Sequence, residues 1–127
     1  MPFCLCRVSV PVSREQECSI KARFGEAVAH ALGLDEKYLL LGIESGCRLY
    51  LRGGGDEPVA YVEVNVFGNE QHRGYDRLTK EITQLFHAVL SIPPGNIYVK
   101  YSDISCWGVG GMTFDNYAHR MRSMLYE

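Results

Sequence analysis

The sequence lacks the features that would place the protein in a membrane or against a polyanion. No apolar run approaches the roughly 20 residues that a membrane-spanning helix needs. Positive charge is not in excess, because 13 Lys and Arg against 15 Asp and Glu give a net charge of -2. This balance gives no reason to expect a nucleic-acid or anionic-membrane partner. The N-terminus also lacks the regions of a secretory signal, so we expect a cytoplasmic protein, with leaderless secretion as the alternative.

Cysteine occurs in a pattern that argues against both disulfides and a metal centre. The count of five is odd, and without a secretory signal we expect reduced thiols. The four histidines form no cluster with these cysteines at the spacing of a four-ligand zinc site. The glycine run at 53–55 lacks the lysine and the following helix of a phosphate-binding loop. The sequence therefore predicts neither a metal nor a cofactor.

What the sequence does contain is apolar material for one globular domain that carries an internal repeat. Of its 127 residues, 46% are hydrophobic and 22% are charged, which is typical of a single soluble core. A pattern of strand, helix and strand occurs twice, offset by about 58 residues, since Phe24 corresponds to Ile82 and Val28 to Phe86. The first copy comprises a strand at 3–10, a helix from the Ser13 capping box to Gly33, and a buried strand at 37–44. The second comprises a strand at 59–66, a helix at 75–90 and a strand at 97–101.

The repeat predicts an α+β fold with one sheet. Each βαβ unit has parallel strands joined by a right-handed crossover, so two units can form a four-stranded sheet with both helices on one face. On the strand at 59–66, Tyr61, Glu63 and Asn65 alternate with valines, which gives the second face a semi-polar character. An exposed sheet face of this size usually marks an interface, so we expect an oligomer.

Three further segments lie outside the two repeats. The stretch 48–52 alternates as a short strand would, and 107–112 has the glycines of a tight hairpin. The tail at 115–127 places Tyr117, Met121 and Leu125 on one helical face, so we expect a helix docked on the body.

The N-terminus offers the most direct route to chemistry. Removal of Met1 would leave the secondary amine of Pro2 free at the start of a strand that tethers it. An α-amine has a reference pKa of about 7.7 to 8.0, which burial among apolar groups lowers. A neutral amine near pH 7 is a good general base. Taken alone, this stretch favours the simpler interpretation, that Pro2 is no more than the residue that follows the initiator.

Several segments together resemble one family. Pro2, the loop at 53–58, Ile97-Tyr98-Val99 and Met112-Thr113-Phe114 stand in the same order as in the tautomerase superfamily, of the macrophage migration inhibitory factor and D-dopachrome tautomerase type. The resemblance covers residues 2–114 and leaves 115–127 as a C-terminal extension. It implies a homotrimer whose sheets form a central barrel, with active sites between neighbouring subunits. It also implies a keto–enol tautomerase that acts on phenylpyruvate-like 2-keto acids.

The resemblance assigns roles to particular residues. Pro2 matches the catalytic base, and Tyr98 matches the tyrosine that the adjacent subunit contributes. Phe67, Val109 and Phe114 fall in the apolar wall of the pocket. For the single tryptophan, Trp107, a packing role and a substrate contact are equally open.

Two departures from the family concern the charge of the site. Leu34 stands where the family has a lysine, and Lys100 stands where it has an asparagine. The carboxylate of a keto acid needs a cationic partner in an apolar pocket. We predict that Lys100 supplies this charge, in preference to Lys37, because strand alternation puts Lys100 on the same face as Tyr98.

Other functions remain open within and outside the superfamily. A dehalogenase or decarboxylase would need arginines for the substrate acid, and Arg73 and Arg77 are available, but no carboxylate stands at a matched position. A cytokine-like binding protein without physiological catalysis is the second alternative. Thiol redox activity is not expected, since Val59 and Val62 occupy the positions of the Cys-x-x-Cys pair in the mammalian cytokine.

Overall fold

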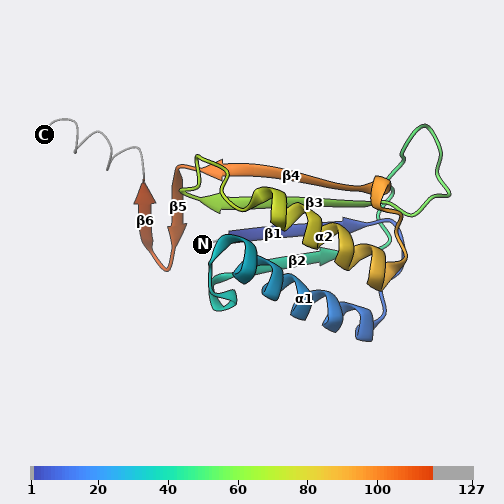
Figure 1. The fold of residues 1–127 in the computed structure, drawn as a ribbon, viewed down its shortest axis with the longest axis horizontal. Coiled ribbons are helices and arrows are strands. Elements are labelled where there is room, and N and C mark those ends of the chain that lie inside the picture. The colour runs from blue at the N-terminus through green and yellow to red at the C-terminus, as the bar shows by residue number, and fades with distance from the viewer. Residues whose placement is uncertain (1, 116–127) are drawn as a thin grey trace, which may run out of the picture.

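The computed structural model describes residues 2–115, which build one four-stranded mixed sheet backed by two helices (Figure 1). In chain order the elements are β1 (Pro2–Val8), α1 (Arg14–Leu32), the 3-10 turn Glu36–Tyr38, β2 (Leu40–Glu44), β3 (Ala60–Phe67), α2 (Tyr75–Leu90), the 3-10 turn Pro94–Asn96, β4 (Ile97–Ile104), β5 (Cys106–Val109) and β6 (Met112–Asp115). Asp115 ends β6, and the rest of the predicted helical tail lies outside the described residues.

The sheet confirms the internal repeat. Its strand order is β2-β1-β3-β4, and each repeat contributes a parallel pair, β1 with β2 and β3 with β4. The two repeats meet through the antiparallel pairing of β1 with β3. Both helices cover the same face, as Figure 1 shows. Neither described helix is long and apolar enough to span a membrane.

The helices begin and end as their sequences dictate. At the start of α1, the Ser13 hydroxyl accepts from the Gln16 backbone at 3.1 Å, and the Gln16 side chain accepts from the Ser13 backbone at 2.9 Å. Gly33 ends α1 in the left-handed conformation, with φ of 67°. The predicted bounds of α2 are confirmed to the residue. The inner faces pack Phe24 and Phe86 fully buried against the valines of β3.

Two predicted strands differ from the structure. The stretch 37–44 begins with a 3-10 turn, and β2 starts only at Leu40. It is an edge strand rather than a buried one, because it pairs with β1 alone, and the Leu40 side chain is 64% exposed. The stretch 48–52 forms no strand, only an isolated bridge between Leu51 and Gly54. By contrast, β4 continues beyond the predicted 97–101 to Ile104.

The sheet face away from the helices is here called the open face. Residues that pair across strands share a face, and successive residues alternate between faces. The open face carries Phe3, Leu5 and Arg7 of β1; Leu40, Gly42 and Glu44 of β2; Tyr61, Glu63, Asn65 and Phe67 of β3; and Tyr98, Lys100, Ser102 and Ile104 of β4. Apolar and charged side chains are mixed on it, and Arg7 pairs with Glu44 at 2.9 Å.

Candidate active site

Pro2 is fixed at the first position of β1. The residue is buried, and it pairs in register with Val66 near the end of β3. Val66 pairs in turn with Asp103 on β4, so these three residues form one row across the sheet. Because β1 is bonded to neighbours on both sides, the position of Pro2 is set by the sheet rather than by a loose terminus.

An aromatic wall stands beside this end of the sheet. Phe67 follows Val66 and points to the open face. Its ring lies 6.3 Å from that of Phe114, at 65° between planes, which is an edge-to-face contact. Phe114 pairs across the hairpin with Trp107, so Trp107 shares its face. The tryptophan therefore lies on the same hairpin face as Phe114.

Val109 lies further out on the same hairpin. It pairs with Met112, and alternation puts both side chains on the face that carries Trp107 and Phe114. Val109 is half exposed, and Figure 1 shows β5 and β6 projecting beyond the end of the sheet where the N-terminus lies. The hairpin thus has one apolar face, of which only the inner end contacts Phe67.

Tyr98 and Lys100 do not meet Pro2 within one chain. Tyr98 is in register with Tyr61 and, through it, with Arg7. Arg7 is five residues along β1 from Pro2, a separation of roughly 17 Å. Tyr98 is 53% exposed, and Lys100 is also exposed. The two therefore share the open face, with Tyr98 near the opposite end of the sheet from the proline and Lys100 nearer its middle, in the row of Glu63 and Leu5.

The position of the missing family lysine is apolar in the structure as well. Leu34 is half-buried and packs against the core. The nearby alternative cation, Lys37, is 66% exposed and already engaged: its Nζ lies 5.1 Å from the centre of the Tyr38 ring and 4.0 Å from Asp35 Oδ2. Lys37 is thus a solvated side chain with an anionic neighbour.

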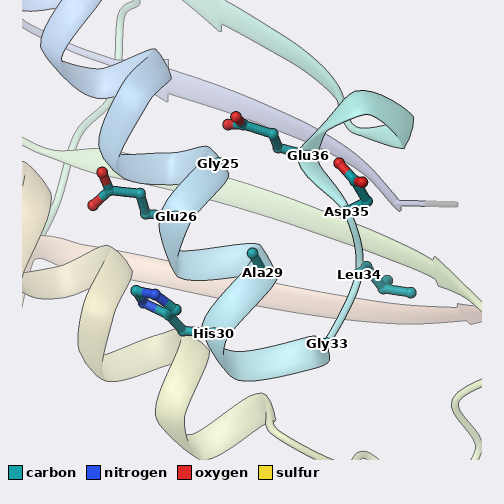
Figure 2. Close-up of a pocket in the computed structure, with 8 residues that line it drawn as sticks. All are labelled: Gly25, Glu26, Ala29, His30, Gly33, Leu34, Asp35 and Glu36. Carbon is teal, nitrogen blue, oxygen red and sulfur yellow. The ribbon is translucent and has the colours of Figure 1, made fainter.

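A separate pocket beside this segment does not suit an anionic substrate. It encloses about 500 Å³ between α1 and the residues that follow it, and Pro2 is not among its lining residues. Figure 2 shows Glu26 and His30 on the helix, and Asp35 and Glu36 on the adjoining segment. Three carboxylates would repel the acid group of a keto acid.

A polar cluster near Pro2 was not anticipated from the sequence. The Tyr75 hydroxyl donates to Asp103 Oδ1 at 2.6 Å, and His72 Nε2 lies 2.7 Å from Oδ2 of the same carboxylate. Burial, and then the Asp103 carboxylate, raises the pKa of Tyr75 above its usual value. No sequence pattern pointed to Asp103, because the strand predicted from the sequence ends at Tyr101, before this residue.

The two cysteines of β1 offer no nucleophile. Burial raises the pKa of the Cys4 thiol to about 12 and raises that of Cys6 as well. Both thiols therefore stay protonated at neutral pH. Within residues 2–115, no group of three His, Cys, Asp or Glu side chains is arranged to hold a metal ion.

Comparison with known proteins identifies the family. The model of the macrophage migration inhibitory factor family matches residues 1–114. The MIF2 crystal structure from Leishmania major aligns with a TM-score of 0.82 at 25% identity, covering 90% of this chain and 97% of that one. A homologue from Prochlorococcus marinus aligns with a TM-score of 0.78 at 24% identity, covering 88% and 98%. The sequence has no significant match among curated proteins. The chain belongs to the macrophage migration inhibitory factor family, within the tautomerase superfamily.

Proposed function

We propose that this protein is a keto–enol tautomerase for phenylpyruvate-like 2-keto acids, with the amine of Pro2 as general base once Met1 is removed. The observation that carries the proposal is the burial of Pro2 at the start of β1, paired with Val66, at the end of the sheet where Phe67 and Phe114 meet. An amine in apolar surroundings favours its neutral form, and the neutral form is the base.

The reaction needs one proton to move between two atoms of the substrate. Pro2 removes a proton from the carbon next to the ketone and returns it to the oxygen, or performs the reverse. The apolar wall of Phe67, Val109 and Phe114 excludes water and keeps the amine neutral. Tyr98 donates a hydrogen bond to the developing enolate oxygen or to the substrate carboxylate.

This arrangement requires a neighbouring subunit, and we propose a homotrimer. Tyr98 lies roughly 17 Å from Pro2 along its own sheet, so its hydroxyl cannot reach its own proline. The open face is uncovered in the single chain, with Leu40 and Tyr98 both more than half exposed. A closed ring in which the open faces line the interior would bring each Tyr98 to the Pro2 of the next subunit.

The substrate carboxylate would meet Lys100 of the same neighbour. Lys100 lies two residues from Tyr98 on the open face, about 7 Å along β4. Its register partner is Glu63, whose carboxylate already accepts from the Tyr61 hydroxyl at 3.1 Å and lies 3.7 Å from Arg7. Lys37 is the weaker candidate because its ammonium group already interacts with the Asp35 carboxylate and the Tyr38 ring.

The other reactions of the superfamily have less support. Arg73 donates through Nε to Gln71 at 3.0 Å, and Arg77 lies 3.7 Å from Glu81 on the exposed side of α2. Arg73 lies in the loop before α2 and Arg77 in α2 itself, so neither belongs to the open face that carries Tyr98 and Lys100.

The proposal is tested by assaying phenylpyruvate and hydroxyphenylpyruvate tautomerisation with protein whose intact mass shows that Met1 is gone. Pro2→Gly leaves a primary amine and should lose most of the activity while the fold persists. Folded, Met1-free protein that turns over neither substrate would instead favour a binding protein without catalysis.

A further inference from the structure

The row that holds Pro2 ends in a carboxylate. Pro2, Val66 and Asp103 are successive partners across β1, β3 and β4, and all three point to the helix side. Two strand spacings put the Cα atoms of Pro2 and Asp103 about 10 Å apart. Val66, which lies between them, is apolar and only 3% exposed. A buried apolar residue therefore separates the carboxylate from the amine.

The carboxylate is held in place by two aromatic side chains. His72 Nε2 and the Tyr75 hydroxyl each contact one Asp103 oxygen, at 2.7 and 2.6 Å. The Tyr75 ring is stacked on the rings of His72 and Tyr101, with ring centroids 5.3 Å and 4.1 Å away, respectively. The Tyr101 hydroxyl is bonded to Thr79 at 2.6 Å. The stack fixes both the imidazole and the carboxylate relative to the sheet.

We propose that Asp103 and His72 act together as positioning residues that set the protonation state of the Pro2 amine. The inference rests on the proposed role of Pro2 as base. A negative charge at Asp103 favours the protonated amine, and a positive charge on His72 offsets it. Because the two charges act on the amine in opposite directions, removing one or the other should shift its titration midpoint in opposite directions.

Other charged and titratable groups around this end of the molecule have weaker claims. Cys4 and Tyr101, which flank the row, stay neutral because burial raises the pKa of each. The remaining groups are exposed and, unlike Asp103, do not lie in the Pro2 row. They are Asp35, Glu36 and Lys37 after α1, Glu70 and Arg73 before α2, Asp76 in α2, and Cys106 and Asp115 in the hairpin.

The test is a pH titration of the Pro2 amine by NMR, using Met1-free protein with isotope-labelled proline at low salt. Asp103→Asn should lower the titration midpoint by on the order of 0.5 to 1 pH unit. His72→Gln should raise it. Tyr75→Phe, which removes a hydrogen bond to the same carboxylate without changing a charge, should leave the midpoint in place.

Midpoint shifts in opposite directions for Asp103→Asn and His72→Gln distinguish an electrostatic role from a structural one. The proposal is overturned if Asp103→Asn and His72→Gln move the midpoint in the same direction, or if Tyr75→Phe moves it as far as Asp103→Asn. The His72 side chain is 63% exposed, so His72→Gln should fold even if Asp103→Asn does not. In that case His72→Gln decides alone, and an unchanged or lowered midpoint in this variant would refute the proposal.

The titration needs no turnover, so its outcome is separate from that of the tautomerase assay. Opposite midpoint shifts in a protein without activity would leave the electrostatic coupling standing while the proposed function fails. In an active protein, the pKa of the acid limb in the pH profile of kcat/KM should shift in the same direction as the amine midpoint in each of the two variants.

Discussion

At the scale of single residues, burial in one environment has opposite consequences for two neighbouring groups of β1. Pro2 and Cys4 are both buried on the helix side of β1. Burial favours the neutral form in each case, but with opposite consequences. A neutral amine is a base, whereas a neutral thiol is unreactive. The same environment therefore supports Pro2 as a base and removes Cys4 and Cys6 from the chemistry.

The charge of the substrate gives the first test at this scale. Lys100→Met should raise KM for phenylpyruvate and have much less effect on its methyl ester, because only the acid needs a cationic partner. Lys37→Met is the matched control and should change neither. The assignment is wrong if Lys100→Met is silent while Lys37→Met raises KM for the acid.

The buried thiols also make stability depend on pH in the alkaline range. The pKa of Cys4 is raised from 9.0 to about 12 in the folded protein, so the unfolded chain releases this proton first. The stabilisation is complete below pH 9 and is lost as pH rises from 9 towards 12, at up to about 1.4 kcal/mol per pH unit per thiol. Cys4→Ala should flatten the dependence of the unfolding free energy on pH.

The control for this measurement is Cys18→Ala, since Cys18 lies exposed on α1. That variant should keep the slope of the native protein. Equal slopes for the native protein and Cys4→Ala would contradict the assignment of the slope to buried thiols.

At the scale of elements, the loop before α2 passes closely against the end of α1. Gly74, just before α2, has φ of 79°, and a Cβ there would collide with the carbonyl oxygen of Ala31 near the end of α1. Gly33, the last cap of α1, has a similar φ of 67° but open space around it. The two glycines thus share a left-handed backbone and differ in crowding.

These glycines form a matched pair of mutations. Gly33→Ala should cost about 1 kcal/mol of unfolding free energy, from the left-handed backbone alone. Gly74→Ala should cost clearly more, because it adds a collision with backbone. Urea unfolding measures the unfolding free energy of both variants. Equal decreases would show that the ends of the two helices can move apart at little cost in free energy.

Elements with a strong hydrophobic period could be predicted from the sequence, whereas partly covered ones could not. The stripe of α2 and the capping box at Ser13 use local signals, so their bounds agree with the structure. The run at 37–44 is as apolar as a buried strand, but its place at the sheet edge depends on pairing that no local pattern encodes. Asp103 was missed for the same reason, since its partners are His72 and Tyr75, about 30 residues earlier.

At the scale of the whole molecule, the candidate site is divided between the two ends of one sheet. The resemblance to the family assigned Pro2, Phe67 and Phe114 to one site, and the structure brings the two phenylalanines together at the Pro2 end. It leaves Tyr98 near the other end and Lys100 near the middle of β4. Completion of the site by a neighbouring subunit remains a prediction.

Subunit mixing tests this division. Pro2→Gly and Tyr98→Phe should each impair activity as homotrimers. Co-refolded mixtures should recover about one functional site in four, because some sites combine the intact proline of one subunit with the intact tyrosine of the next. Sedimentation should give three times 14.3 kDa. A stable monomer, or mixtures no more active than the weighted mean of the parents, would contradict a shared site.

The most direct test of Pro2 as the base compares two forms of one chain, with Met1 removed and with Met1 retained, each verified by intact mass. Retention converts the free secondary amine into an amide, which is not a base, and changes no other side chain. We expect rapid phenylpyruvate tautomerisation from the Met1-free form and nearly none from the Met1-retaining form. Equal rates from the two forms would show that the Pro2 amine is not the base.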